Sequence, residues 1–447
     1  MTSTKTQLQS FHDKFQGKKI KHCRILGNTL NFGYDSLGIC CSSTLPHAPV
    51  LCNTDLVKRG SFHKDDFIQY LLEIMYGNQC DGICTGCEAL EEFVFEGFDY
   101  ESMQLNHIIW NNFRGCNSRC VYCTENNSKI LESYTAYKIA EDLYQEGFLS
   151  ENTKIDFGGG EPTMLPNLKD YLQFGYDHHW RQTINTSGIL FSQDIYDGLS
   201  QGVSVQISPD AGTRQTYQKV KRCDCFDRVW NHIGRYCDYP DQVSVKYIVF
   251  SWNSSQEDLD GFVAQCKKHG VKRVVVSGEG SAIFGSAAEG YTWEFGEREE
   301  AACAYLIQEC LNNGLAVYFS SGNFSKTIQK RVFQKLSDFL KDSQTENKSG
   351  LYIFGMGSNG KMLCDALMEA NIPMNGFLDN APEKWEQSYH GLAQRQFDPH
   401  FQRKFPSGFG AAETGRIPAY PYISRITELE ILKPEGERCD DLDKSGT

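Results

Sequence analysis

Residues 113–126 read FRGCNSRCVYCTEN and follow an apolar strand candidate, His107–Asn111. Cys116, Cys120 and Cys123 therefore form a C-x3-C-x2-C triplet on one short loop. Three thiolates on such a loop can hold three irons of a cubane [4Fe–4S] cluster and leave the fourth iron open to a ligand that is not protein. The alternatives are buried free thiols or a zinc site, but zinc usually takes four protein ligands. The triplet thus favours an iron–sulfur cluster.

The region around this loop alternates between two kinds of pattern. Short apolar runs predict strands, and stretches with apolar residues at helical spacing lie between them and predict helices. Strands separated by helices indicate βαβ units, a parallel sheet and a full or partial (β/α) TIM-like barrel. The other predicted strands are Lys154–Phe157, Gln182–Asn185, Ser204–Ile207, Val243–Phe250, Arg273–Val276 and Leu315–Phe319. The predicted helices are Thr135–Glu146, Asp194–Gln201, Phe226–Tyr236, Gln256–His269 and Glu299–Asn312.

Polar and glycine-rich segments follow successive strands of this pattern. In chain order they are Gly158-Gly159-Gly160-Glu161-Pro162, then Asn185-Thr186-Ser187-Gly188, then Ser208-Pro209-Asp210-Ala211-Gly212-Thr213, with Lys246 on the next strand. In a (β/α) barrel the chemistry lies at the carboxyl ends of the strands. Each segment taken alone could be an ordinary turn or helix cap. Their common placement and order indicate one site that includes the cysteine loop.

This set of motifs, over about residues 105–320, resembles the radical S-adenosylmethionine (radical SAM) superfamily. The resemblance implies a [4Fe–4S] cluster on the triplet, with Tyr122 as the aromatic residue before the last cysteine. It also implies that S-adenosylmethionine binds the open iron and yields a 5′-deoxyadenosyl radical that takes a hydrogen atom from a substrate. The residues it assigns to this cofactor are Gly158, Gly159, Gly160 and Glu161 (methionine amine), Asn185 and Ser187 ("TNG" position), Ser208 and Asp210 (ribose or carboxylate), and Lys246 (near the adenine).

A second C-x3-C-x2-C triplet precedes the predicted barrel. It consists of Cys80, Cys84 and Cys87, and Cys41 or Cys40 is the expected fourth ligand. The group resembles the auxiliary-cluster modules of SPASM and twitch-type radical enzymes, although those modules usually follow the barrel. An auxiliary iron–sulfur cluster is the preferred interpretation. A structural zinc site or a region without metal is the alternative.

A further βαβ unit is predicted near the C-terminus. The strand Leu351–Phe354 leads directly into a G-x-G-x-x-G pattern of Gly355, Gly357 and Gly360, and a second strand ends at Asp379. This order is typical of dinucleotide-binding folds, in which the glycines let the backbone approach a phosphate. The segment resembles a nucleotide-binding half-domain of surface-sugar modification enzymes. A bound nucleotide, a partner contact and a unit without ligand all remain open.

These patterns predict four parts of the 447-residue chain. They are a cysteine-rich module (residues 1–98, irregular apart from a helix at Asp65–Met75), the radical SAM barrel (99–325), a linker helix with the Rossmann-like unit (326–395) and an extended or partly disordered tail (396–447). The net charge of −13 argues against nucleic-acid binding. The polar N-terminus and the lack of an apolar run of about 18 residues predict no secretory signal, no membrane span and a cytoplasmic location.

The expected activity is hydrogen-atom abstraction from a small-molecule or sugar-derivative substrate, such as a sugar nucleotide, in an oxidation or epimerisation. A reductant such as flavodoxin or ferredoxin would supply electrons. Two alternatives stay open at this stage: a peptide-modifying radical SAM enzyme, and a non-catalytic iron–sulfur or zinc scaffold. Intact cofactor-binding motifs argue against the scaffold.

Overall fold

The structure is a computed structural model that describes most of the chain between residues 3 and 425. The described residues are 3–23, 26–34, 36–39, 50–53, 62–80, 82–85, 90–123, 134–279, 295–320, 323–343, 351–354, 358–369, 374–379, 387–396 and 422–425. No helix within these ranges is long and apolar enough to cross a membrane.

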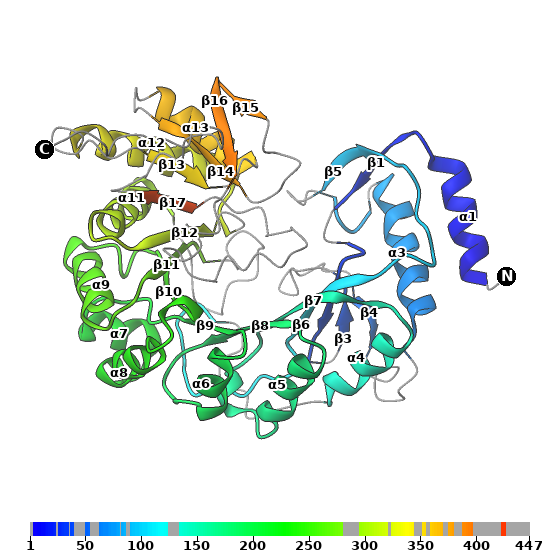
Figure 1. Ribbon diagram of the computed structural model, residues 1–447, viewed down its shortest axis with the longest axis horizontal. Helices are drawn as coiled ribbons and strands as arrows, with labels where there is room; N and C mark the ends of the chain where they lie inside the picture. The colour runs from blue at the N-terminus through cyan, green and yellow to red at the C-terminus, as the bar shows by residue number, and fades with distance from the viewer. Residues whose placement is uncertain are drawn as a thin grey trace, which may run out of the picture.

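The centre of the molecule is a strongly curved, open sheet of parallel strands, seen as an arc in Figure 1. Its order is β2-β6-β7-β8-β9-β10-β11-β12, and each neighbouring pair is parallel. The predicted α/β class with a partial TIM-like barrel is confirmed. The strands are β2 (Thr29–Phe32), β6 (Leu105–Trp110), β7 (Leu149–Phe157), β8 (Arg181–Thr186), β9 (Val203–Ile207), β10 (Val243–Ile248), β11 (Arg273–Ser277) and β12 (Ala316–Ser320).

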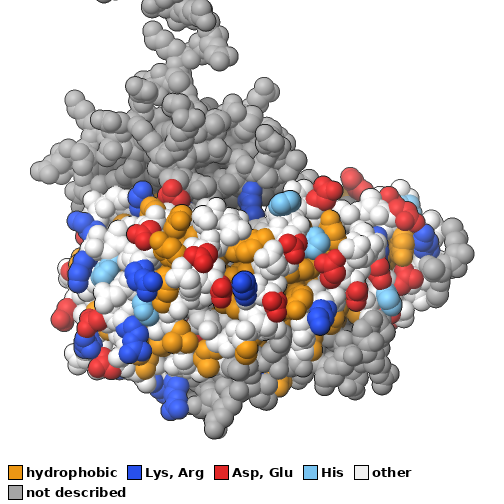
Figure 2. Space-filling model, turned by 60° about the horizontal axis from the view of Figure 1, so that its bottom comes forward, with side chains coloured by type: hydrophobic (Ala, Val, Ile, Leu, Met, Phe, Trp, Pro, Cys, Tyr) orange, Lys and Arg blue, Asp and Glu red, His pale blue; other side chains and the backbone are white. Residues whose placement is uncertain are grey.

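Helices cover the convex side of this sheet (Figure 1). They are α4 (Ala136–Gln145), α5 (Leu168–Asp177), α6 (Gln193–Leu199), α7 (Arg214–Lys221), α8 (Phe226–Tyr236), α9 (Gln256–Lys268), α11 (Glu297–Asn312) and α12 (Lys326–Ser343). α5 and α7 were not predicted from the sequence, whereas the five predicted helices of this region are present. The convex face turned to the reader in Figure 2 carries acidic and basic side chains in alternation, with no continuous basic area on that face.

The two faces of the strands differ in chemistry because successive side chains point to opposite sides. Val203, Val205 and Ile207 of β9 are buried in the core between sheet and helices. The intervening residues Ser204 and Gln206 are only partly buried and face the concave side. The same alternation on the neighbouring strands places Asp156, Thr183, Asn185 and Lys246 on that side. The concave side of the barrel is therefore lined by polar groups.

The N-terminal region contains more regular structure than predicted. Besides α3 (Lys64–Asn78), it forms α1 (Ser3–Phe15) and a two-stranded antiparallel sheet of β1 (Lys19–His22) and β5 (Glu91–Val94). β2 extends the barrel sheet, and β3 (Ser36–Gly38) and β4 (Val50–Asn53) continue it antiparallel. The expectation of an irregular region was wrong because long-range contacts create these elements. In α1, for example, Phe11 is buried against Tyr76 and Phe95.

The C-terminal βαβ unit is present. β13 (Leu351–Phe354) pairs in parallel with β14 (Met374–Asp379), with α13 (Ser358–Glu369) between them. β16 (Leu392–Gln396) continues this sheet and pairs with β15 (Ser388–Tyr389). β17 (Tyr422–Arg425) pairs antiparallel with both β12 and β13. The predicted tail therefore contributes a strand that joins this unit to the barrel sheet, which its local composition does not reveal.

His22, at the end of β1, makes stability in the N-terminal region depend on pH. Burial lowers the pKa of His22 to about 4, because its ring is enclosed near Phe93 and Phe98. The unfolded chain binds a proton at this residue near pH 6.5 and the folded chain does not. The contribution of neutral His22 to the free energy of unfolding is thus fully present above pH 6.5. We expect about 3 kcal/mol to be lost as the pH falls to about 4. Urea unfolding at several pH values should show a smaller loss in a His22→Gln variant. If the free energy of unfolding falls equally with pH in the wild type and in His22→Gln, this assignment is wrong.

Candidate functional site

The cysteine loop lies at the carboxyl ends of β6 and β7, where the GGGEP segment supports it. The Gly160 N–H donates to the Phe113 carbonyl at 2.9 Å, and the Glu161 N–H donates to the Gly115 carbonyl at 2.8 Å. Cys116, Cys120 and Cys123 are each partly buried. Burial raises the pKa of the Cys116 thiol to about 11, so metal binding there would displace a proton. The loop is thus held by backbone contacts on one side, and its thiols remain partly accessible.

The three glycines of GGGEP are required for this close packing. A Cβ atom on Gly160 would lie 2.3 Å from the Gly115 carbonyl oxygen, and one on Gly158 would lie 2.2 Å from Asn111 Oδ1. Gly159 has a φ of +70°, in the left-handed region that favours glycine. Close backbone approach was predicted toward the cofactor. In the structure the glycines serve first to bring β7 against the cysteine loop.

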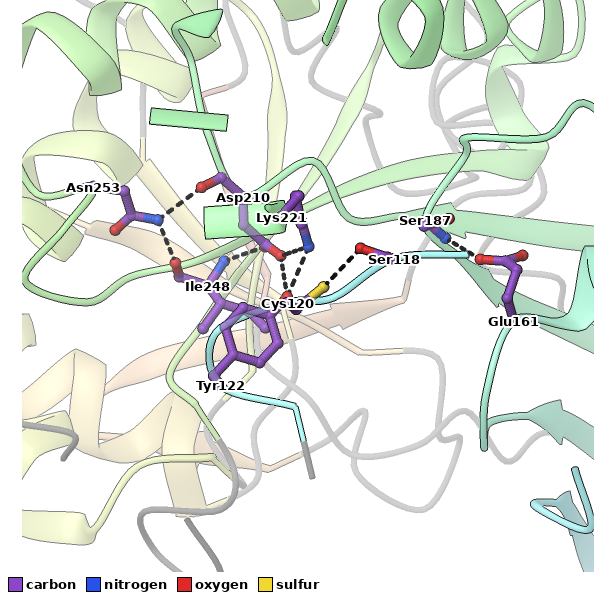
Figure 3. Close-up of polar contacts among 9 residues, drawn as sticks. All are labelled: Ser118, Cys120, Tyr122, Glu161, Ser187, Asp210, Lys221, Ile248 and Asn253. Atoms are coloured by element: carbon purple, nitrogen blue, oxygen red, sulfur yellow. Dashed lines mark hydrogen bonds and ion pairs between the residues drawn. The ribbon is translucent and has the colours of Figure 1, made fainter. Parts of the chain in front are cut away.

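Glu161 connects two of the predicted motifs. Its carboxylate is buried and accepts hydrogen bonds from the Thr163 hydroxyl (2.7 Å), the Thr186 hydroxyl (2.6 Å) and the Ser187 N–H (2.8 Å). The bond to Ser187 is drawn in Figure 3. These bonds fix the end of β7 to the end of β8. The predicted role of Glu161 toward the methionine amine stays a prediction.

Asp210 is the centre of a buried polar group with Lys221 and Tyr122 (Figure 3). Its Oδ2 atom accepts from the Lys221 ammonium at 2.5 Å and from the Tyr122 hydroxyl at 2.5 Å, and Lys221 also donates to the Tyr122 oxygen at 2.7 Å. Burial and the Asp210 carboxylate raise the pKa of Tyr122 well above its usual range. Asp210 therefore fastens the aromatic residue of the cysteine loop to the segment after β9, and a direct role toward the ribose or carboxylate remains a prediction.

The backbone around Asp210 is held in an unusual conformation. Asp210 has a φ of +50°, in the left-handed region that a residue with a Cβ atom rarely adopts. Asn253 is fully buried, and its amide donates to the carbonyls of Asp210 (2.9 Å) and Ile248 (2.8 Å). The Ile248 N–H donates to Asp210 Oδ1 at 2.8 Å. Asn253 thus fixes the backbone of Asp210, and Ile248 at the end of β10 fixes its side chain.

The loop residue Asn117 lies beside the predicted "TNG" segment. Its Oδ1 atom accepts from the Ser187 hydroxyl at 3.2 Å. Its Nδ2 atom is buried and has no hydrogen-bond partner within the described part of the chain. A buried donor without a partner is costly unless a ligand satisfies it. This donor, next to three partly accessible thiols, fits a polar cofactor at this position.

The other residues predicted to contact S-adenosylmethionine lie on the same edge of the sheet. The Asn185 amide donates to the Phe157 carbonyl at 2.9 Å and accepts from the Gln206 amide at 2.7 Å, so it links three strands. The Ser208 N–H donates to the Thr186 carbonyl at 3.2 Å. Burial lowers the pKa of Lys246 on the concave side of β10. The structure brings all the predicted motifs of the barrel together.

The second cysteine group falls largely outside the described residues. Cys80 is exposed and Cys84 is partly buried, whereas Cys87, Cys40 and Cys41 lie outside the described ranges. Within those ranges, the loop triplet of Cys116, Cys120 and Cys123 included, no three His, Cys, Asp or Glu side chains converge as ligands of a single metal ion. The auxiliary cluster stays a prediction.

The same holds for the C-terminal nucleotide site. Gly355 and Gly357 are outside the described residues. Gly360 lies in α13, and Asp379 ends β14 as predicted. The strand–helix–strand order of a phosphate-binding turn is thus present, and the ligand stays a prediction.

Sequence reasoning missed Lys221, Asn117 and Asn253. Asn117 could have been found, because it lies inside the cysteine motif next to Cys116. Lys221 gives no such signal, since it follows Tyr122 by 99 positions and sits at the end of a helix that was not predicted. Asn253 likewise acts through contacts across the sheet.

Comparison with known proteins assigns the barrel to a family. Residues 110–253 match the radical SAM superfamily. Mycofactocin maturase MftC of Mycobacterium ulcerans (strain Agy99) is 25% identical over 186 residues, which cover 40% of this chain and 49% of the relative. Fe-coproporphyrin III synthase of Methanosarcina barkeri (strain Fusaro / DSM 804) is 31% identical over 121 residues, or 26% of this chain and 29% of the relative. The chain spans about half the length of the maturases that it matches.

Among solved structures, Streptococcus suis SuiB bound to S-adenosylmethionine is similar with a TM-score of 0.41 and 14% identity, over 62% of this chain and 61% of that chain. The resemblance stated from the sequence is confirmed by the family match: residues 110–253 form a radical SAM domain. The family uses a [4Fe–4S] cluster and S-adenosylmethionine, as predicted.

Proposed function

We propose that this chain is a radical SAM enzyme that modifies a peptide substrate, with the cluster held by Cys116, Cys120 and Cys123. The observation that carries the proposal is that four strand-end segments meet around the cysteine loop within the family region. When bound, the cluster and S-adenosylmethionine supply a 5′-deoxyadenosyl radical that takes a hydrogen atom from the substrate.

The residues of this site would bind and orient the cofactor. Asn117 and the Ser187 segment offer hydrogen-bonding groups beside the loop, and Glu161 holds that segment in place. The close contact between GGGEP and the loop backbone excludes water from that side. A reductant such as flavodoxin or ferredoxin would deliver the electron.

The peptide substrate replaces the small-molecule or sugar-derivative substrate that the sequence favoured. The relatives named as maturases support the peptide alternative better. The sugar-nucleotide idea rested on the C-terminal glycine pattern alone.

The test is anaerobic reconstitution with iron and sulfide, followed by dithionite and S-adenosylmethionine, with 5′-deoxyadenosine measured by chromatography. We expect about four irons per cluster and 5′-deoxyadenosine above the enzyme-free blank. Addition of a dialysed polypeptide fraction from the source cells should increase its formation, and protease treatment of that fraction should remove the increase. Formation without any cluster would overturn the radical assignment. An increase that survives protease treatment, or that comes only from the dialysable fraction, would overturn the peptide substrate.

A further inference from the structure

The C-terminus of α7 contacts the cysteine loop directly. The Val121 N–H donates to the Val220 carbonyl at 3.0 Å, and the Arg119 N–H donates to the Lys221 carbonyl at 3.3 Å. The last carbonyls of a helix lack partners within the helix, and here the loop supplies them. The loop is therefore fixed to the negative end of the α7 dipole, which would disfavour further negative charge on a nearby cluster.

The side chain of Lys221 returns to this loop from the same helix end. It is 2% exposed and donates to Asp210 at 2.5 Å and to the Tyr122 oxygen at 2.7 Å. Its ammonium group is paired with the fully buried Asp210 carboxylate, and a side-chain hydrogen bond also joins it to Cys120. Cys120 also lies 3.1 Å from the Ser118 hydroxyl (Figure 3). Lys221 thus places a buried cation beside Cys120.

We propose that Lys221 is a positioning residue that sets the reduction potential of the cluster through its charge and hydrogen bond at Cys120. The inference rests on the proposed function, since it assumes a cluster on this loop. One-electron reduction adds negative charge to the cluster and its thiolates, and a buried cation beside a thiolate stabilises the reduced form. The Asp210 carboxylate holds the cation at this position. Lys221 thereby favours the reduced state that S-adenosylmethionine cleavage needs.

The test is a redox titration of the reconstituted full-length protein without S-adenosylmethionine or substrate. Dithionite supplies the electron, and the paramagnetic signal of the reduced cluster is followed at set potentials. In Lys221→Gln we expect the equilibrium constant for reduction to fall at least tenfold, which is about 59 mV toward more negative potential. Lys221→Arg keeps the charge and should stay within about threefold of the wild type. Lys219→Gln removes the same charge from an exposed position of α7, where solvent screens it, and should also stay within about threefold.

A second variant guards against failure to fold, because Lys221→Gln leaves Asp210 buried without its cation. The double variant Lys221→Gln/Asp210→Asn replaces the ion pair with neutral groups. It should show a smaller fall in the same direction, still more than about threefold, because the lost carboxylate charge offsets part of the lost cation. Iron content and circular dichroism confirm that each variant is intact. An unchanged potential in an intact Lys221→Gln or double variant overturns the proposal, as does an equal fall in Lys219→Gln. If the wild-type protein takes up no cluster, the proposed function itself fails, which is a separate result.

Discussion

A variant in which Cys116, Cys120 and Cys123 are all alanine is expected to lose about four irons and to form no 5′-deoxyadenosine above the blank. The reason is that thiolate ligands hold the cluster, and the hard chemistry belongs to the cofactor rather than to the side chains around it. Iron should be counted after anaerobic reconstitution of both proteins, and 5′-deoxyadenosine measured with dithionite and S-adenosylmethionine. Any iron left in the variant would report a cluster at Cys80 and Cys84.

The matched control removes three cysteines of similar burial that lie outside the triplet. Cys223, Cys225 and Cys237 are partly buried like those of the loop, and they flank α8. Their alanine variant should keep its iron and its 5′-deoxyadenosine formation. If both triple variants lose the same iron, the loss reflects general unfolding. If the loop variant keeps its iron and activity, the cluster is elsewhere and the assignment is wrong.

A single methyl group on Gly160 is expected to reduce cluster assembly several-fold. The new Cβ atom would lie 2.3 Å from the Gly115 carbonyl oxygen and 2.6 Å from the Arg114 carbonyl carbon. Both atoms are backbone, so the cysteine loop itself must shift and its bonds to Gly160 and Glu161 break. We expect Gly160→Ala to destabilise the protein by about 2–4 kcal/mol. Urea unfolding measures this cost, and iron uptake should fall several-fold in parallel.

Gly296→Ala is the control for the effect of a methyl group alone. Gly296 has an ordinary extended backbone before α11, and the nearest atom to its added Cβ would be a flexible Glu299 oxygen at 3.7 Å. Its substitution should change stability by less than about 1 kcal/mol and leave iron uptake unchanged. Equal effects of the two substitutions would show that the contact between GGGEP and the loop does not matter for cluster assembly.

Much of the barrel could be predicted because its signals are local. The alternation of apolar strands and amphipathic helices follows from side-chain periodicity, and the structure confirms the predicted strands within a few residues. The N-terminal strands could not be predicted in this way. β2 forms because Thr29–Phe32 pairs with His107–Trp110, more than seventy positions away, and no local pattern encodes that pairing.

The sequence by itself determined the kind of chemistry. The spacing of the cysteine triplet can be read directly from the sequence. So can the order of GGGEP, NTSG and SPDAGT, because each motif is a short run next to a single strand. The tertiary structure alone decided how these motifs act on one another. A side chain at Gly160 would collide with the backbone of the cysteine loop, which follows a different strand. Lys221 reaches Cys120 only because α7 ends against that loop. Contacts of this kind depend on distances across the sheet, which spacing along the chain does not contain.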